Sequence, residues 1–377
     1  MGAHTRRSAA ITRAISRGLD GENEHAEQGK WSRAVKRVIE FFSIFHLDLD
    51  RYRGDDFYAL RHDFWDLDED EYIESFRSRA GDDARDAGQQ SDERLIPAGN
   101  LGYSGSTFFH TSNSKYLVKS LDRSFENEFF MHELFEPYAA YIKSHPNSLL
   151  NRITDTMYAP RSTLGSIFGI QPRHYIIMEN LLHGQDGGED GARWETYDLK
   201  PDDYFFPERD IAEGRLAPDS VKDRLIDQFN DELRVPADMK QLLTDICTED
   251  TSFLASSNVV DFSLFLARYP IYATDDSAAE TSSIAASAKQ SPSWRTGVLS
   301  TDGKWVYRAV LLDFLWAKHK LHPKFMSGLI GAFNIFFKKG PMTITTEPLE
   351  YSGRFMRMVD QLLKEGDEGR EAGTSAG

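Results

Sequence analysis

The stretch NVVDFSLFL, residues 258–266, places one carboxylate, Asp261, inside a run of strand-forming apolar residues. Two other stretches share this character: KYLVKSL at 115–121 holds Lys119, and RAVLLDFLW at 308–316 holds Asp313. A strand alternates its faces with a period of two, so each of these charges is expected to share a face with apolar neighbours. The expected face partners are Leu117 and Leu121 for Lys119, Val259 for Asp261, and Leu311 and Leu315 for Asp313.

A charge on a core-facing row costs several kcal/mol, roughly, unless it is paired or binds a metal. One buried cation and two buried carboxylates are what a magnesium–nucleotide site requires: the cation holds phosphate, one carboxylate binds Mg²⁺, and one positions the attacking hydroxyl. Each residue also has a plainer interpretation. A lysine in a strand commonly extends its ammonium to water, and a buried aspartate can cap a turn or pair with an arginine such as Arg268 or Arg308. The joint occurrence of the three favours the nucleotide site.

The bulk composition excludes several classes of protein. With 377 residues, the chain is long enough for two domains or one domain of two lobes. Its net charge of −16 argues against sequence-independent nucleic-acid binding, although a local basic patch could still bind a membrane surface. Cys247 is the single cysteine, which excludes an intrachain disulfide and a cysteine-based zinc site and fits a reducing, cytoplasmic compartment. No apolar run approaches the roughly 20 residues of a membrane span.

Hydrophobic periodicity and turn signals divide the chain into five parts. The predicted parts are a basic, flexible N-terminal arm (1–30), a helical segment with a polar linker (31–94), an N-lobe (95–182), a C-lobe (183–366) and a tail (367–377). Within the C-lobe, the low-complexity residues 273–294 are predicted to be disordered. The arm is rich in arginine and small residues and lacks acids in its first 19 positions, which is typical of a mitochondrial transit peptide or, as we favour, of a basic helix or disordered arm.

Predicted helices cover residues 31–46, 56–65, 69–79, 125–146, 220–233, 236–256, 322–340 and 351–366. Predicted strands include a hairpin around residues 112–114, a buried strand at 174–182, and the two aspartate-bearing stretches.

A glycine-rich segment precedes the lysine strand and contains Gly102, Gly105 and Ser106. Glycines let a backbone approach a ligand closely, and their N–H groups can point at phosphate oxygens. Glycine-rich turns between strands are also common without any ligand. An acidic helix follows the lysine strand, and Glu128 is the residue expected to pair with Lys119, as a lysine–glutamate pair does in protein kinases. The alternative for this glutamate is a solvated helix face.

Taken in order, these motifs resemble those of the phosphatidylinositol phosphate kinase family over about residues 41–364. The segments that carry the resemblance are SGSTFFHTSNSKYLVKSL (104–121), SHPNSLL (144–150), IMENL (177–181), YDLK (197–200), VDFSLF (260–265) and LLDF (311–314). The resemblance implies a two-lobed α+β lipid-kinase fold, with antiparallel sheets, packed helices and the nucleotide between the lobes.

The resemblance also implies roles for individual residues. Lys119 would grip phosphate, Asp261 would lie near the attacking inositol hydroxyl, and Asp313 would bind magnesium. Lys200, which composition alone assigns to the surface, would assist at the phosphates, and the glycine-rich segment with Gly105 and Ser106 would form the nucleotide loop. ATP and Mg²⁺ are the implied cofactors.

The implied reaction is phosphorylation of a phosphoinositide head group, with phosphatidylinositol 4-phosphate favoured as the substrate and its 5-hydroxyl as the acceptor. A modest lysine cluster would hold the protein peripherally at the membrane, and a homodimer is compatible with the family. The lysines of that cluster are Lys318, Lys320, Lys324, Lys338 and Lys339.

The chain departs from the family after YDLK, where Pro201-Asp202-Asp203 replaces Gly-Ser-Thr. This departure motivates the alternative of a weakly active or inactive lipid-binding scaffold. A third alternative is a soluble kinase of an inositol phosphate or another small molecule.

Overall fold

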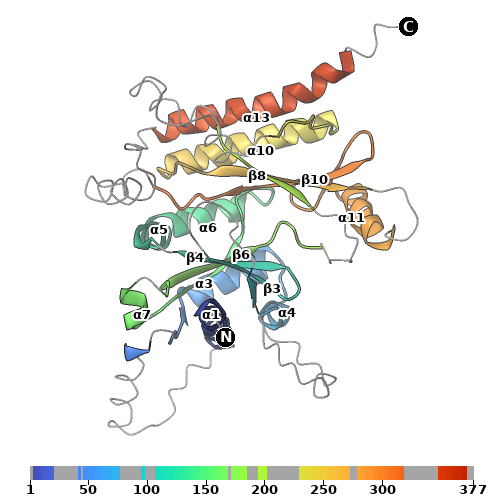
Figure 1. Cartoon of the computed structure of the whole chain (residues 1–377). Coiled ribbons are helices and arrows are strands. Elements are labelled where there is room, and N and C mark those ends of the chain that lie inside the picture. Colours follow the sequence, from blue (N-terminus) through green and yellow to red (C-terminus); the bar gives the residue numbers. More distant parts are fainter. Residues whose placement is uncertain are drawn as a thin grey trace. The chain divides into compact units, whose positions relative to one another are not determined.

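The chain divides into two units, one formed by residues 1–127 and 152–184 and the other by 128–151 and 185–377. The division lies close to the predicted lobe boundary but assigns residues 128–151 to the second unit. Both units combine helices with an antiparallel sheet, which confirms the predicted α+β class (Figure 1). The computed structural model describes residues 3–20, 41–43, 46–76, 95–97, 107–121, 123–168, 171–184, 194–201, 229–271, 278–317 and 347–371.

The first unit contains a six-stranded sheet in the order β1-β5-β6-β4-β3-β2. Its strands are β1 (Asp50–Arg51), β2 (Leu95–Pro97), β3 (Phe108–Thr111), β4 (Tyr116–Leu121), β5 (Ile153–Tyr158) and β6 (His174–Glu179). Strands β3 and β4 form the predicted hairpin, with the turn at residues 112–115. Strand β6 lies between β5 and β4, and its nearly continuous apolar sequence agrees with this interior position.

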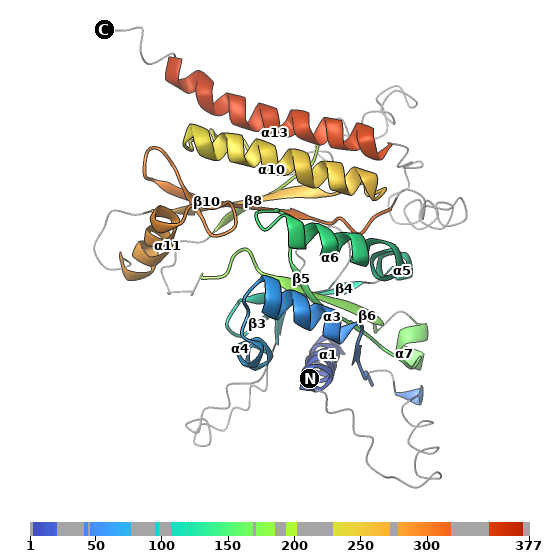
Figure 2. The same cartoon turned by 180° about the vertical axis from the view of Figure 1, so that it is seen from behind.

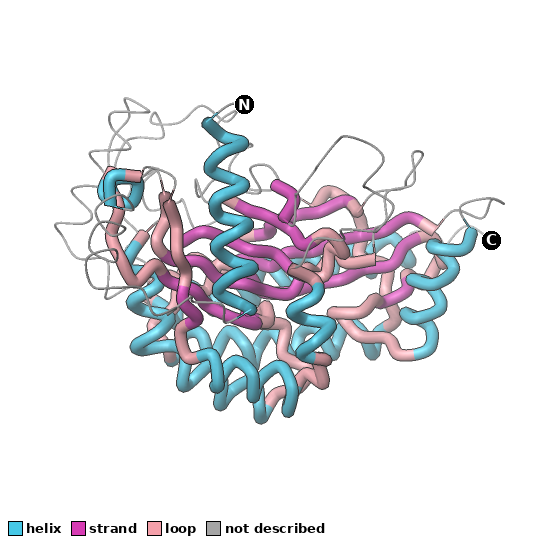
Figure 3. Tube along the Cα trace, turned by 90° about the horizontal axis from the view of Figure 1, so that it is seen from below, coloured by secondary structure: helices cyan, strands magenta, loops and turns pink. Residues whose placement is uncertain are grey.

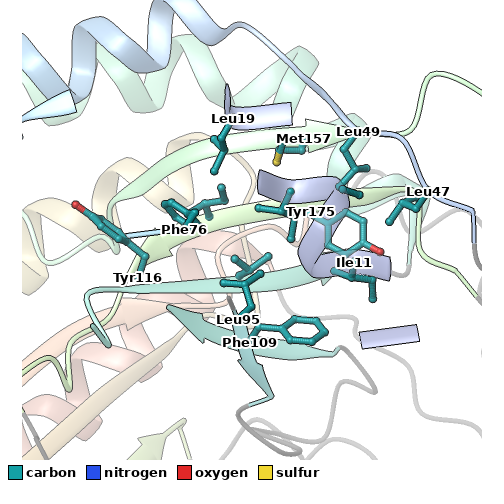
Figure 4. Close-up of a cluster of buried hydrophobic side chains, with 14 of the residues drawn as sticks. Ile11, Leu19, Leu47, Leu49, Phe76, Leu95, Phe109, Tyr116, Met157 and Tyr175 are labelled. Carbon is teal, nitrogen blue, oxygen red and sulfur yellow. The ribbon is translucent and has the colours of Figure 1, made fainter. Parts of the chain in front are cut away.

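Helix α1 (Ala3–Asp20), which begins near the N-terminus, lies across the strands of the first unit (Figure 3), and its apolar residues belong to the core of that unit. Ile11 and Leu19 are buried among Phe109, Met157 and Tyr175 from the sheet (Figure 4). Of the two favoured interpretations, a basic helix and a disordered arm, residues 3–20 adopt the helix. The apolar residues of this segment recur at helical spacing and so form one face of the helix, which packs against the sheet.

Four short helical segments complete the described part of the first unit: α3 (Gly54–Ala59), η1 (Leu60–Phe64), α4 (Glu69–Glu74) and α7 (Leu164–Ile167). The Asp68 carboxylate caps α4 by accepting the backbone N–H of Glu71 at 2.8 Å. The fully buried Arg61 binds Glu69 through two nitrogens, at 2.8 and 2.7 Å, and Asp155 of β5 at 3.3 Å. These ion pairs join the predicted helices at 56–65 and 69–79 to the sheet.

The second unit contains a four-stranded sheet in the order β7-β8-β10-β9. Its strands are β7 (Glu195–Leu199), β8 (Ser263–Pro270), β9 (Val298–Leu299) and β10 (Trp305–Leu312). Helices α10 (Ala237–Ser256) and α13 (Pro348–Glu371) lie side by side along this sheet (Figures 1 and 2). The predicted helix at 125–146 is observed as α5 (Ser124–Phe129), η3 (Phe130–Leu134) and α6 (Phe135–Ser144). None of the helices in the described ranges is long and apolar enough to cross a bilayer.

Residues 273–294 differ from their predicted disorder. Helix α11 (Ala278–Gln290) occupies most of this segment, and Ile284 and Ala288 are buried. Trp294 is 1% exposed, and its indole N–H donates to the carbonyl of Met239 at 2.9 Å. Although the composition is of low complexity, Ile284 and Ala288 are spaced four residues apart, and their burial holds the helix against the rest of the unit.

Several predictions fall wholly or partly outside the described residues. These are the linker at 79–94, the glycine-rich segment, most of the helix at 31–46, the helix at 322–340 and the lysine cluster. The predicted helix at 220–233 is outside them up to residue 228, and residues 229–233 are not helical.

Candidate functional site

The last residues of β7 and β10 and the first residues of β8 lie together at one end of the second unit's sheet. Leu199, the last residue of β7, pairs with Leu264 near the start of β8. Leu312, the last residue of β10, pairs with Ser263, the first residue of β8. Because neighbouring strands in this sheet are antiparallel, the ends of β7 and β10 must lie beside the beginning of β8. The residues just beyond these ends are therefore brought together although they are far apart in sequence.

Those residues are Lys200, Asp261 and Asp313. The Lys200 ammonium donates to the Asp261 carboxylate at 2.8 Å and to the Asp261 carbonyl at 3.0 Å. Burial alone would lower the pKa of Lys200, but the attraction of Asp261 and then of Asp313 outweighs it and raises the pKa well above its usual range. Lys200 is therefore a permanent cation, bonded to Asp261 and attracted by Asp313, at any physiological pH.

Both aspartates adopt the left-handed backbone conformation, with φ of 68° at Asp261 and 60° at Asp313. This conformation is uncommon for residues other than glycine, and aspartate is among the residues that tolerate it best. Such residues cluster at active sites, where the surrounding structure holds them in place. The two positive φ angles occur just before β8 begins and just after β10 ends, at the same end of this strand pair.

A buried phenylalanine follows each aspartate and anchors it. Phe262 is fully buried and meets the ring of Tyr351 on α13 edge to face, with centroids 4.8 Å apart. The Tyr351 hydroxyl donates to the Phe262 carbonyl at 2.5 Å. Phe314 is 3% exposed and stacks on Tyr138 of α6, with centroids 5.9 Å apart. The repeated Asp-Phe pair thus places an apolar anchor directly beside each charged residue.

The prediction that both aspartates lie inside strands was wrong. Asp261 comes two residues before β8 begins, and Asp313 follows the last residue of β10. The Asp261 side chain is 21% exposed, so it stands at the rim of the core and not on a buried row. Strand ends allow a charge to be held beside an apolar core without the full cost of burying it. The alternative of an Asp261–Arg268 pair is not observed, because Lys200 binds Asp261 and Arg268 binds Glu195 at 2.7 Å.

Lys119 lies in β4 of the first unit, as predicted, but on the less buried face of its strand. Tyr116 and Val118 face the buried core, whereas Leu117 and Lys119 are half-buried on the opposite face. The Lys119 ammonium lies 5.5 Å from the ring centroid of Phe108 on the paired strand β3. Its expected role at phosphate remains a prediction.

Glu128 is exposed on α5, which contradicts its expected inward orientation. Glu126 is the buried glutamate of this helix, 7% exposed, and it pairs with Arg123 at 3.2 Å. Each helical residue turns by about 100°, so Phe125 and Phe129 face inward while the residue before Phe129 is carried toward solvent. Gly102, Gly105 and Ser106 lie outside the described residues.

The donor set at the strand ends fits magnesium. Mg²⁺ is usually held by one or two carboxylates together with phosphate oxygens and water. Asp261 and Asp313 provide two carboxylates at one place, and Lys200 between them provides a cation for phosphate. Among the residues that the structure describes, no cluster of three or more histidine, cysteine or acidic side chains could hold a metal ion by itself.

Reasoning from composition missed the central position of Lys200, which YDLK alone assigned to the surface. Its side chain is 17% exposed, and Asp198 of the same strand adds to the negative field around it. The signal that could have found the site is an Asp-Phe step inside an apolar run, which occurs at Asp261 and at Asp313.

A family model described as phosphatidylinositol-4-phosphate 5-kinase matches residues 89–296, more than half of the chain. The matched range contains Lys119, Lys200 and Asp261. It ends before Asp313, whose place in the site comes from the register of β10.

Two curated relatives match part of the chain. A phosphatidylinositol 4-phosphate 5-kinase of Plasmodium falciparum is 29% identical over 168 residues, which is 43% of this chain and 9% of that protein. A probable phosphatidylinositol phosphate kinase of Dictyostelium discoideum is 27% identical over 172 residues, which is 45% of this chain and 22% of that protein. The chain thus matches less than a quarter of the length of either relative.

Proposed function

The chain belongs to the phosphatidylinositol-4-phosphate 5-kinase family, and we propose that it transfers the γ-phosphoryl group of ATP to a hydroxyl of a phosphoinositide head group. The proposed acceptor is the 5-hydroxyl of phosphatidylinositol 4-phosphate, which would give the 4,5-bisphosphate. The observation that carries this proposal is the Lys200–Asp261 ion pair beside Asp313, at the point where three strand ends meet.

Asp261 is the proposed acceptor of the hydroxyl proton. Lys200 occupies one carboxylate oxygen of Asp261, which orients the carboxylate and leaves the other oxygen for the substrate hydroxyl. As the inositol oxygen bonds to the γ-phosphorus, its proton passes to Asp261 and the bond to the β–γ bridging oxygen breaks, so that ADP leaves. General-base assistance of this kind contributes about 10²–10⁴-fold in rate.

Lys200 and Asp313 would carry the electrostatic part of the reaction. The Lys200 ammonium is held by the Asp261 carboxylate and carbonyl, lies in the field of Asp313, and is available to the transferring phosphoryl oxygens. Asp313 would hold Mg²⁺ together with the nucleotide phosphates, and the metal would neutralise the charge that develops on them. Charge stabilisation by groups that are already in place is commonly the largest contribution to such reactions.

Lys119 and the glycine-rich segment would hold the nucleotide phosphates from the first unit. The lysines between 318 and 339 would bring the chain to an anionic membrane, each exposed lysine contributing about 1 kcal/mol there. Both assignments belong to the proposal.

The decisive experiment is a kinase assay with radiolabelled ATP on vesicles that each carry one phosphoinositide isomer. We expect Asp261→Asn, Asp313→Asn and Lys119→Met to lose at least about 100-fold in turnover. Asp302→Asn serves as the matched control, because Asp302 lies in the turn before β10, away from the site. Undiminished turnover in Asp261→Asn or Asp313→Asn would remove the proposed mechanism, and phosphorylation of an isomer other than the 4-phosphate would change the proposed substrate.

The departure after YDLK supports a second candidate, a lipid-binding scaffold with little or no catalysis. Pro201 follows Lys200 directly and is buried, at the position where the family pattern has glycine. The two candidates differ in nucleotide binding. An active enzyme should show a Mg²⁺-dependent rise in melting temperature with ATP, because a ligand that binds only the native state stabilises it. A scaffold should bind vesicles without that rise.

A further inference from the structure

A short segment, residues 148–151, extends the sheet of the second unit beside the end of β10. Leu150 bridges Leu311 in parallel orientation. The Leu311 amide donates to the Leu149 carbonyl at 2.7 Å, and the Asn151 amide donates to the Leu311 carbonyl at 3.1 Å. Strand β9 pairs with β10 only at residues 306 and 307. Closer to Asp313, residues 148–151 take the place of β9 as the neighbour of β10. We call residues 148–151 the edge segment.

Asp250 of α10 holds the edge segment in place. Its carboxylate is fully buried and accepts the Leu149 amide at 2.6 Å through one oxygen and the Tyr141 hydroxyl at 2.8 Å through the other. A carboxylate that accepts a backbone N–H inside a protein makes one of the stronger hydrogen bonds available to it. Asp250 therefore couples α10 to the segment that lies against the last residues of β10.

Two other side chains secure the same segment. Arg295 donates to the Ser148 carbonyl at 3.0 and 2.9 Å and also to the Leu150 carbonyl. Tyr138 donates its hydroxyl to the Asn151 carbonyl at 3.0 Å, and its ring stacks on Phe314. The residue after Asp313 is thus in contact with a side chain that also holds the edge segment.

Helix α10 leads to the other aspartate of the site. The helix ends at Ser256, and the Val259 amide still donates to the Leu254 carbonyl at 2.9 Å. The Val260 amide then donates to the Trp316 carbonyl at 2.9 Å, which joins the chain just before Asp261 to the chain just after Asp313. Asp250 is therefore placed on the element that delivers Asp261 and bonded to the segment that supports Asp313.

We propose that Asp250 is a positioning residue, which sets the place of Asp313 relative to Asp261 and Lys200 by holding the edge segment against β10. The effect of Asp250 passes through the backbone hydrogen bonds at Leu149 and Leu311. The inference rests on the proposed function for its catalytic consequence, but its structural half can be measured without any activity.

The test compares three variants. Asp250→Ala removes the hydrogen bonds to the Leu149 amide and the Tyr141 hydroxyl, together with the one to the Ser148 side chain. Asp250→Asn can keep the first two, because its amide oxygen can accept the Leu149 amide and its NH₂ can donate to the Tyr141 oxygen. Ser300→Ala is the matched control: it removes a buried hydroxyl at the opposite end of β10, where the Ser300 hydroxyl bonds Asp302 at 2.7 Å. All are studied at a temperature at which each variant is folded.

The first readout is amide hydrogen exchange of residues 305–317 by mass spectrometry. Asp250→Ala should speed exchange around Leu311 by at least tenfold, whereas Asp250→Asn and Ser300→Ala should leave it near the wild-type rate. Unchanged exchange in Asp250→Ala would overturn the proposal whether or not the chain is a kinase.

The second readout is kinetic. Asp250→Ala should lower kcat at least tenfold and raise the Mg²⁺ concentration at half-maximal rate, with the lipid KM little changed, and Asp250→Asn should recover most of the rate. The loss of kcat in Asp250→Ala is compared with its loss of stability, and Ser300→Ala shows how much kcat falls for a given loss of stability. If the fall in kcat is no larger than this relation predicts, Asp250 has a merely structural role and the positioning claim is refuted. Absence of kinase activity in the wild type would refute the proposed function, and the exchange experiment would still decide the inference.

Discussion

Asp261 and Asp313 are mirror-like in local structure: each has a left-handed backbone, each lies at an end of the antiparallel pair β8–β10, and each is followed by a buried phenylalanine. The pairing of β8 with β10 brings the two residues to the same end of the sheet, and the phenylalanines hold them there. Lys200, at the end of the neighbouring strand, binds the first aspartate and lies in the field of the second.

Replacing Lys200 should damage catalysis more than folding. Lys200→Met leaves Asp261 without its ion-pair partner and removes the cation next to Asp313, so we expect kcat to fall at least about 100-fold. Lys200→Arg keeps the charge and should retain more of the rate. Steady-state kinetics on phosphoinositide vesicles measures both, and equal rates for the Met and Arg variants would contradict a role for the charge.

The Lys200 ion pair should stabilise the fold equally from pH 7 to about pH 9. The folded-state pKa is raised, so the pair's contribution is complete below the unfolded pKa of about 10.4 and is lost only as pH rises through the higher folded pKa. Melting temperatures of the wild type and Lys200→Met should therefore differ by a constant amount across this range. A difference that shrinks between pH 7 and 9 would show that the ammonium titrates earlier than expected.

Truncating either phenylalanine anchor should destabilise the second unit. Phe262→Ala and Phe314→Ala each remove a buried ring, for an expected loss of about 3–5 kcal/mol in the free energy of unfolding. Phe314→Leu keeps most of the volume and should lose less. Urea denaturation measures the losses, and a cost below 1 kcal/mol for Phe314→Ala would mean that its ring does not anchor Asp313.

In the first unit, Asp155 should matter more to stability than Glu69. Asp155 is fully buried and bonds both Arg51, at 2.7 Å, and Arg61, whereas Glu69 remains 24% exposed. Breaking a buried pair leaves an uncompensated charge and costs about 3–5 kcal/mol, so Asp155→Ala should approach that loss and Glu69→Ala should fall short of it. Thermal unfolding of the two variants decides the order, and the reverse order would refute the assignment.

Cys247 should be inert in the native protein. Its thiol is fully buried on α10, and burial raises its pKa well above the usual value. Because the thiolate is the reactive form, a thiol-specific reagent should modify the native chain very slowly and the urea-unfolded chain at once. Since the chain has one cysteine, the reaction rate also reports how often the second unit opens. Rapid labelling without denaturant would contradict the buried position.

Much of the local structure could be predicted from the sequence because its signals are short-range. The hairpin around 112–114, the buried strand at 174–182 and the helix at 236–256 follow from turn residues, apolar continuity and helical spacing. Composition misjudged α11, since it is a weak helix by pattern and its few apolar residues gain stability only against other elements.

The sequence by itself determined which charged residues interrupt apolar runs, and so it identified Asp261, Asp313 and Lys119. It did not determine that two of them lie beyond strand ends, that Glu128 faces solvent, or that Lys200 pairs with Asp261. The positions of Asp261, Asp313 and Lys200 depend on strand register and on the packing of Phe262 and Phe314, which are long-range properties of the fold. A period-two pattern specifies which residues share a face, but where a ladder stops is decided by the neighbouring strand to which it is hydrogen-bonded.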